Sequence, residues 1–232
     1  MAERVIRHRQ RATPTRTGVV LDSEVIVAAA IRLLEEHGTL SVRQLGTELG
    51  ADPSAIYRYF RNVDALLLAV ADRMVGEAMD GFEPSGDWVA SLRDLAMRGY
   101  RAYLAHPQAA RAVAARTSDL PNTARMIDTI IGVLLSAGFD GATAVRLCLS
   151  LGDLMLAFAT LDAGFALLSP DARKADEATW ARLGTLDPDT HPHIAAVAGH
   201  FSPDLDSFPA TLDLLLASFA ALAPGGAIPG RP

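Results

Sequence analysis

The sequence predicts an all-α fold, and three observations support that prediction. Apolar residues recur at i, i+3, i+4 and i+7 in one segment after another, which is the spacing of a helix face. Cap residues, prolines and glycines stand where such segments begin and end. Strand-like alternation is not convincing in any segment, and no internal repeat is found. The chain has 232 residues, 50% of them apolar, so it can fill a sizeable core.

Composition narrows the class of protein further. The single cysteine, Cys148, cannot form a disulfide within the chain, which disfavours a secreted scaffold and fits a reducing cytoplasm. No apolar signal core follows the basic N-terminus, and no uncharged apolar run is long enough to cross a bilayer. No nucleophile elbow, phosphate-binding loop, dinucleotide fingerprint or pair of catalytic carboxylates stands out. We therefore expect neither an enzyme nor a cofactor.

The first helix is expected to begin after Asp22, a suitable N-cap, and to end at Gly38. Glu24 in its first turn interacts favourably with the helix dipole. The apolar residues that share one face of this helix are Ile26, Ala29, Ala30, Leu33 and Leu34. This segment therefore predicts an amphipathic helix with one buried face.

Two short helices are expected next, separated by a glycine turn. Ser41 with Gln44 three residues later forms a capping box, and the helix that it opens ends at Gly50. Asp52 then caps a helix that has Pro53 at its first position. This helix has room for two turns, up to residue 60.

A connecting helix and a longer helical region follow. Asn62 caps the connecting helix, which continues to a Gly/Pro-rich break at residues 81–86. The segment 142–168 is apolar nearly all round, so its helix must be buried on several sides. Residues 169–190 are interpreted as a polar connector around Trp180. The helices expected beyond the break cover 87–105, 107–116, 121–135, 142–168, 193–200 and 204–222.

Charge is distributed unevenly along the chain. The net charge of −6, taken alone, counts against a nucleic-acid partner. Residues 1–20 carry a net charge of +4, residues 21–75 carry −3 and residues 76–232 carry −7. A basic arm on an acidic body can bind a polyanion with one end only. A solvated, disordered tail would have the same composition, so charge leaves nucleic-acid binding open.

Residues 41–60 have the pattern of a helix, a three-residue turn with glycine, and a second helix. This is the helix-turn-helix geometry, in which the second helix enters the DNA major groove. Helical spacing points Val42, Leu45, Leu49, Ile56 and Phe60 inward. It points Arg43, Ser54, Ala55, Tyr57, Arg58 and Tyr59 outward.

The outward residues suit DNA, because phenolic hydroxyls bind phosphates and an arginine fork binds guanine or a phosphate pair. The alternative is a small helical hairpin whose tyrosines pack on a neighbour, since helix pairs with a glycine turn are common. An exposed Tyr-Arg-Tyr run on a short helix makes little sense for stability alone. The pattern therefore favours DNA binding.

This stretch resembles the TetR/AcrR family of transcriptional repressors. The resemblance runs without a gap through residues 26–38, 40–50, 54–60 and 62–67. It implies that five residues lie at DNA-facing positions, namely Arg43, Ser54, Ala55, Tyr57 and Tyr59.

One position departs from the family's pattern. Where the family usually has a phosphate-contacting lysine after the asparagine, this chain has Val63. We expect Arg61 or the arginine-rich arm to compensate. Arg9, Arg11 or Arg16 would then reach the minor groove or a phosphate.

The C-terminal half resembles the subgroup with the tetracycline-repressor type of C-terminal domain. Residues 103–111, 134–139, 142–164 and 191–194 carry this resemblance, together with the last helix. In the tetracycline repressor a histidine of the corresponding stretch binds the magnesium of the drug, whereas residues 111–117 contain no histidine. The resemblance therefore implies the domain type but not tetracycline–magnesium as the ligand.

The family's plan also implies a homodimer in which the helices 142–166 and 204–222 pair with their copies. The residue types of the first of these helices agree, since its apolar face holds Leu147, Leu151, Leu154, Met155 and Phe158. A monomeric core helix is the alternative, but so apolar a surface on a chain of this length favours dimerisation. A two-fold dimer predicts a palindromic operator.

A ligand pocket is expected between the helices 87–105, 107–116, 121–137 and 142–166. Its candidate lining residues are Met97, Tyr100, Arg101, Leu104, Met126, Ile130, Leu147 and Phe158. The apolar ones fit a plain core better than a ligand contact, since methionine and aromatic stripes usually pack protein. Arg101 either anchors an anionic ligand or is solvated, and Trp180 either closes the pocket or holds its own loop down.

Metal binding is not expected. The three histidines between residues 191 and 200 lack the spacing of a zinc site. Cys148 stands among leucines, where a thiol behaves as a small buried hydrophobe and not as a redox sensor.

These features together predict four parts. A basic, flexible arm over residues 1–20 precedes a helix-turn-helix DNA-binding domain with its connecting helix over 21–80. A ligand-binding and dimerisation domain over 81–223 and a flexible tail over 224–232 complete the chain.

The predicted function is that of a cytoplasmic homodimeric repressor without a membrane partner. It binds a palindromic double-stranded DNA operator and is released by an unknown small-molecule effector. One alternative is an all-α small-molecule-binding or interaction protein without DNA binding. This alternative is favoured by Val63 and by the absence of a net positive charge on residues 21–75. The other is an activator on the same scaffold.

Overall fold

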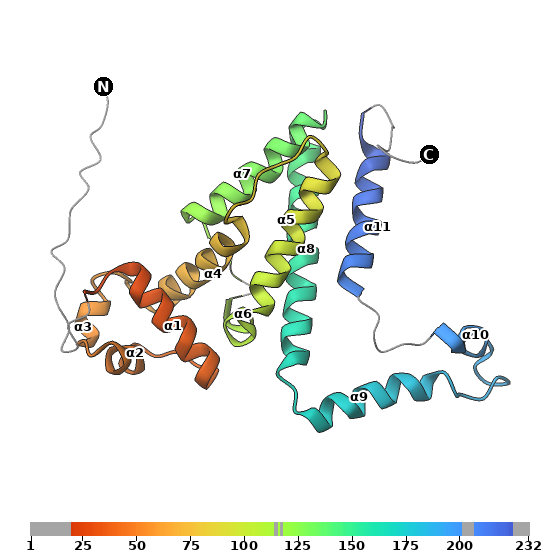
Figure 1. The fold of residues 1–232 in the computed structure, drawn as a ribbon, viewed down its shortest axis with the longest axis horizontal. Helices are drawn as coiled ribbons and strands as arrows, with labels where there is room; N and C mark the ends of the chain where they lie inside the picture. Colours follow the sequence, from red (N-terminus) through yellow and green to blue (C-terminus); the bar gives the residue numbers. More distant parts are fainter. Residues whose placement is uncertain (1–19, 114–115, 117, 201–206, 225–232) are drawn as a thin grey trace.

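The computed structural model describes residues 20–113, 116, 118–200 and 207–224, and it confirms the all-α fold (Figure 1). The basic arm, with Arg16, and nearly all of the tail lie outside the described residues. Within the described ranges the helices are α1 Ser23–His37, α2 Val42–Leu49, α3 Pro53–Ile56, α4 Val63–Met79, α5 Trp88–Leu104, α6 Pro107–Val113, α7 Pro121–Ser136, α8 Gly141–Ala166, α9 Pro170–Leu183, α10 Pro192–Ala196, the short 3-10 helix η1 Ala198–His200 and α11 Ser207–Leu222.

The helices α1, α2 and α3 form a small head at one end of the molecule (Figure 1). Ile26, Leu34, Leu45 and Ile56 are almost completely buried between them and form its core. The predicted N-caps of these helices and of α4 are confirmed. The side chain of Asp22 accepts the N–H of Val25 at 2.8 Å. Those of Ser41, Asp52 and Asn62 likewise accept N–H groups of the helices that they open.

Helix α4 connects the head to the larger body. It packs against α1 on the head side and against α5, α6 and α7 on the body side. Met74 and Val70 are fully buried along it, so α4 belongs to the core of both parts. Because these helices are closely packed, a displacement of any one of them would also displace α4 or disrupt its packing.

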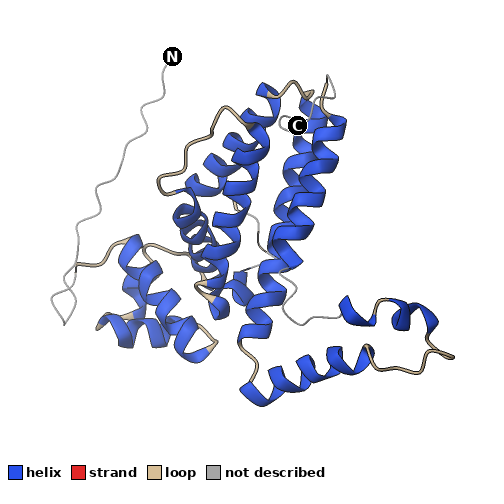
Figure 2. Cartoon of the chain, turned by 45° about the vertical axis from the view of Figure 1, so that its right-hand side comes forward, coloured by secondary structure: helices blue, strands red, loops and turns tan. Residues whose placement is uncertain are grey.

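Helices α5, α6, α7, α8 and α11 make up the body (Figures 1 and 2). Helix α8 lies at its centre, in contact with α5, α6, α7 and α11. Gly99 of α5 lets α8 approach closely, because a Cβ there would lie 3.3 Å from the terminal methyl of Met155.

Helix α8 is long and apolar enough to span a bilayer by length and composition, with a mean hydropathy of 1.6 over its best window. Its four neighbours in the body and its buried face, which includes Leu147, Leu151 and Met155, mark it as a core helix. Packing within the body therefore explains part of the apolar character of α8. The single chain buries one face of the helix and not several, and Leu149 and Leu161 remain exposed.

The expectation of a polar connector over residues 169–190 is wrong. The segment contains the 14-residue helix α9, opened by Ser169, whose side chain accepts the N–H of Ala172, and by Pro170 at its first position. None of the residues of α9 is buried, and α9 stands away from the body together with α10 (Figure 2). With no apolar face, the helix gives no periodic signal in the sequence.

Three helix ends also differ from the predicted ones. Helix α3 is one turn shorter than expected, because the chain forms a turn after Ile56 instead of continuing to residue 60. Helix α6 ends at Val113, and Arg116 lies beyond it. Helix α8 ends at Ala166, two residues earlier than expected. The first of these differences changes which side chains of the head face outward.

Candidate nucleic-acid interface and ligand site

The turn between α2 and α3 is held in a tight conformation by two glycines. Gly50 adopts a left-handed backbone with φ of 61°, and its N–H returns to the end of α2. A Cβ on Gly46 would lie 2.8 Å from the carbonyl oxygen of Ala51, so only glycine fits there. The N–H of Ala51 donates to the carbonyl of Gly46 at 2.8 Å. No sequence pattern around Gly46 predicts this close backbone approach.

Helix α3 presents an exposed polar surface from a buried anchor. Ile56 is 1% exposed and fixes the helix to the head, while Ser54, Tyr57 and Arg58 are exposed. The side chain of Asp52 accepts the N–H of Ser54 at 2.8 Å and so caps the N-terminus of α3. Arg43 is exposed on the neighbouring helix α2. The structure thus leaves these four predicted side chains accessible on the head.

Tyr59 does not point outward, which corrects the prediction from helical spacing. Its hydroxyl donates a hydrogen bond of 2.7 Å to the backbone carbonyl of Leu21, and the side chain is partly buried. The early end of α3 turns this residue toward the start of α1. Ala55 is also partly buried and packs against the core. These two residues therefore stabilise the head, in contrast to Tyr57.

The position after the asparagine is apolar in the structure as in the sequence. Val63 is partly buried and packs against the core, whereas Arg61 is exposed. Asn62 between them accepts the N–H of Ala65 at 2.8 Å. Arg61 is therefore accessible close to where the family's usual lysine would stand, and Arg16 lies outside the described residues.

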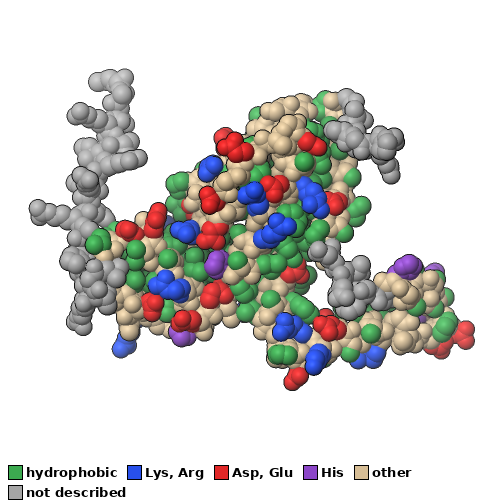
Figure 3. All heavy atoms as spheres, viewed as in Figure 1, with side chains coloured by type: hydrophobic (Ala, Val, Ile, Leu, Met, Phe, Trp, Pro, Cys, Tyr) green, Lys and Arg blue, Asp and Glu red, His purple; other side chains and the backbone are tan. Residues whose placement is uncertain are grey.

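The surface of the head carries both signs of charge. Arg32 forms an exposed ion pair with Glu48 at 3.3 Å. On the face shown in Figure 3, acidic and basic side chains are interspersed over the head and the body. An exposed pair of this kind contributes little to stability, and the negative charge of Glu48 offsets the positive charge of Arg32 on this surface.

In the body the candidate ligand residues come from α5, α7 and α8. The structure brings Tyr100 and Phe158 together around Phe208 of α11, with ring centroids 4.3 Å and 5.6 Å from that of Phe208. The hydroxyl of Tyr100 donates to the Asp162 carboxylate at 2.6 Å. This cluster is a packed aromatic contact of α5, α8 and α11 that carries two polar groups, the Tyr100 hydroxyl and the Asp162 carboxylate.

The other six candidate ligand residues differ in how far their side chains are exposed. Ile130 and Leu147 are buried at 5% and 7%, as expected for core residues. Three are partly buried against the core, namely Met97, Leu104 and Met126. Arg101 is exposed.

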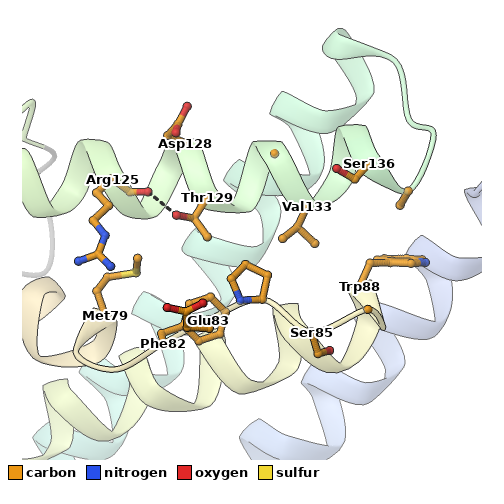
Figure 4. A pocket seen from close by; sticks show the side chains of 14 residues that line it. Met79, Phe82, Glu83, Ser85, Trp88, Arg125, Asp128, Thr129, Val133 and Ser136 are labelled. Atoms are coloured by element: carbon orange, nitrogen blue, oxygen red, sulfur yellow. Dashed lines mark hydrogen bonds between the residues drawn. The ribbon is translucent and has the colours of Figure 1, made fainter.

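Two pockets in the described part of the chain lie elsewhere, and neither is lined by any of the eight candidates. The larger, of about 670 Å³, opens between the end of α4, the 80–87 loop and α7 (Figure 4). Phe82 and Trp88 line it opposite α7, and the Arg125 side chain reaches toward Met79 at one end. The smaller, of about 320 Å³, lies at the junction of α1, α4 and the start of α7. Sequence patterns did not indicate these pockets, because loops form part of their walls.

The described residues also bear on metal and thiol sites. Among the described residues there is no group of three or more His, Cys, Asp or Glu side chains that could hold a metal ion. Burial raises the pKa of the Cys148 thiol, which disfavours the reactive thiolate.

A helix-turn-helix head joined by one helix to an all-α body defines the class of ligand-responsive, DNA-binding transcriptional regulators. Comparison with known families agrees. Residues 26–70 match the model of the bacterial regulatory proteins of the tetR family, and residues 81–222 match the tetracyclin repressor-like C-terminal domain. The chain belongs to the TetR family.

Individual relatives support the same assignment. The tetracycline repressor protein class A from transposon 1721 of Escherichia coli is 33% identical over 130 residues, which are 54% of this chain and 60% of that protein. A possible TetR family transcriptional regulator from Streptomyces coelicolor A3(2) is 31% identical with a TM-score of 0.72, over 87% of this chain and 100% of that one. ActR from Streptomyces coelicolor in complex with actinorhodin is 25% identical with a TM-score of 0.77, over 89% and 99% of the two chains.

Proposed function

We propose that the protein is a homodimeric cytoplasmic repressor that binds a palindromic operator and is released by a small-molecule effector. The proposal rests mainly on the helix-turn-helix head, which has exposed polar side chains. Helix α4 joins this head to the body that is proposed to bind the ligand. Arg43, Ser54, Tyr57 and Arg58 form its accessible polar surface. Arg61 and Arg16 are proposed as phosphate contacts that replace the lysine missing at Val63.

Dimerisation is supported by apolar side chains of α8 and α11 that remain exposed in the single chain. Leu149, Leu161 and Leu214 are 59%, 68% and 71% exposed. The face of α8 with Leu147 and Met155 is already buried within the protomer. The partner is therefore expected to cover the remaining surface of α8 and α11.

The effector site is proposed around Tyr100, Phe158 and Phe208 in the body. Phe208 is 1% exposed and stacks directly on Tyr100, so an effector would have to displace part of this ring contact. An aromatic small molecule with a hydrogen-bonding group would replace the ring contact and bond to the Tyr100 hydroxyl or to Asp162. The relation to ActR, whose complex holds actinorhodin, supports a small-molecule effector. Trp180 on exposed α9 is proposed to close the site in the dimer.

Release follows from a shift between two arrangements of the body. An effector that binds one arrangement better changes the spacing of the two heads, so that they no longer fit two operator half-sites. By linkage, the operator must weaken effector binding by the same factor by which the effector weakens operator binding.

A gel shift with the DNA upstream of the protein's own coding sequence tests DNA binding, and a thermal-shift screen of aromatic compounds finds effectors. We expect retarded operator DNA that an effector releases, with equal coupling in both directions. Independent binding of effector and operator would contradict the mechanism. An interaction protein without DNA binding would retard no DNA, and an activator would raise transcription from the same site.

A further inference from the structure

We propose that Glu35 and Asp72 are positioning residues that fix the DNA-binding half against the ligand-binding half by capping the N-termini of α6 and α7. Glu35 lies on α1 and Asp72 on α4, so both carboxylates come from the head and its connecting helix. The proposal rests on the proposed function in one respect only, namely that α6 and α7 belong to the effector-responsive body.

The two capped helices differ from most others in the described structure. The helices α1, α2, α3, α4, α5, α8 and α9 each follow an Asp, Asn or Ser whose own side chain accepts an N–H of the first turn. Helix α7 follows Leu120, which makes no side-chain cap, and α6 follows His106, whose ring lies 3.3 Å from Glu77. Both begin with a proline, so their first free N–H groups belong to the second and third residues.

Asp72 satisfies these groups at α7. One carboxylate oxygen accepts the N–H of Thr123 at 2.8 Å and its hydroxyl at 2.8 Å. The other accepts the N–H of Asn122 at 3.3 Å and its side-chain amide at 3.0 Å. Asp72 is only 7% exposed, so these bonds are largely shielded from water.

Glu35 has the same relation to α6. It accepts the N–H of Ala109 at 2.9 Å with one oxygen and that of Gln108 at 3.5 Å with the other. Ala109 is completely buried, and α1 packs directly against α6. In both cases, therefore, a carboxylate from the head side supplies the cap that a local residue supplies elsewhere.

A cap of this kind couples the capped helix to the helix that supplies the carboxylate, because the donors are backbone N–H groups that move with the capped helix. The N-terminal N–H groups carry the positive end of the helix dipole and have no alternative partner inside the helix. If an effector shifts α6 or α7 along or across its axis, the head must follow or these bonds must break.

Two ion pairs also join α4 to this region, but they are more exposed. Asp64 pairs with Arg116 at 3.0 Å, and the carboxylate side chain is 69% exposed. Glu77 lies 3.3 Å from His106 with its side chain 34% exposed. Exposed pairs contribute little rigidity, so Asp64 supplies a matched control on the same helix.

Gly76 shows that α4 and α7 must approach closely for the cap to form. A Cβ at this position would lie 2.9 Å from the side-chain nitrogen of Asn122. Alanine there favours the helix but pushes away the amide that donates to Asp72. Gly76→Ala therefore perturbs the cap by displacing this one amide, while the carboxylate, its bonds to the two backbone N–H groups and the bond to the Thr123 hydroxyl remain.

Distances between paired spin labels in the full chain test the proposal. Labels are attached to Glu36→Cys on α1 and Ser136→Cys on α7, both exposed, with Cys148→Ala and an excess of unlabelled protein, so that only the pair within one chain is measured. We expect a narrow head-to-body distance distribution for the parent chain. Asp72→Asn and Glu35→Gln should each widen it, the double variant should widen it more, and Gly76→Ala should widen it as well.

Asp64→Asn should leave the distribution as narrow as in the parent. If Asp72→Asn and Glu35→Gln lower the unfolding temperature but keep that width, the caps only stabilise the fold and the proposal is wrong. A narrow distribution for Gly76→Ala would contradict it too, even if the carboxylate variants fail to fold. The measurement needs no DNA, so a failure of the proposed function in the gel shift is distinguishable from a failure here.

Discussion

Tyr103 lies in the last turn of α5 and is 4% exposed, and burial raises its pKa to about 12. The unfolded chain titrates its tyrosines near pH 10. Below that pH both states are protonated, so the folded state keeps its full stability. Between about pH 10 and pH 12 only the unfolded state loses the proton, and stability falls as the pH rises.

The expected loss from Tyr103 over this interval is about 2–3 kcal/mol. Denaturant unfolding from about pH 9 to about pH 12 measures it. Tyr103→Phe should remove this part of the pH dependence, because no hydroxyl remains to ionise. Tyr57→Phe is the matched control, because it removes the same hydroxyl from a side chain that is 51% exposed. Equal profiles for the parent chain and Tyr103→Phe would show that the buried hydroxyl does not carry the effect.

At the residue scale, helical spacing predicted buried positions better than exposed ones. Ile56 was expected inward and is buried, and Tyr57 was expected outward and is exposed. Tyr59 was expected outward on the same helix but reaches the carbonyl of Leu21, 38 positions earlier in the chain. No local pattern encodes a bond to a distant backbone oxygen, and Tyr59 lies in the turn after Ile56 and not on the helix.

At the scale of elements, the close packing of the turn between α2 and α3 predicts how alanine substitutions of glycine change the stability of the protein. Gly46→Ala should destabilise the protein by about 1–3 kcal/mol, since its Cβ would meet the Ala51 carbonyl at 2.8 Å. Gly132→Ala in α7 should instead stabilise it by about 0.5–1 kcal/mol, because nothing lies within 4 Å and alanine favours a helix. Denaturant midpoints of the two variants give the comparison. A similar response of both would mean that the turn relaxes around the added methyl.

Elements with a local signal were predictable, and those held by distant residues were not. Asp22, Ser41, Asp52 and Asn62 marked helix starts correctly, because an N-cap acts within three residues of itself. The caps of α6 and α7 escaped prediction, since their carboxylates come from other helices. Helix α9 escaped it for another reason, because propensity and capping form it without an apolar face.

At the scale of the whole molecule, α8 and α11 carry the proposed contact between protomers. Leu161→Arg should dissociate the dimer while the protomer stays folded, because this side chain is 68% exposed in the single chain. Leu135→Arg on α7 is the control, since it is also exposed, at 48%, but lies outside the proposed interface. Sedimentation velocity over a range of concentrations reads out the association. A dimer that survives Leu161→Arg as well as it survives Leu135→Arg would place the interface elsewhere.

The division of charge along the chain leads to a prediction for the arm. The arm carries a net +4, whereas residues 21–75 carry −3, so the head alone attracts DNA weakly. Each phosphate that the protein neutralises adds about 0.9 to the slope of log affinity against log salt. Removal of residues 1–19 should therefore lower the slope by several units per dimer and weaken binding to all sequences alike.

Replacing the arm's arginines with glutamine should have the same effect. Replacing them with lysine should keep the slope, because the contact depends on the positive charge. If the truncated protein keeps the slope of the full chain, the phosphate contacts belong to the head, and Arg43, Arg58 and Arg61 are then the residues that compensate for Val63.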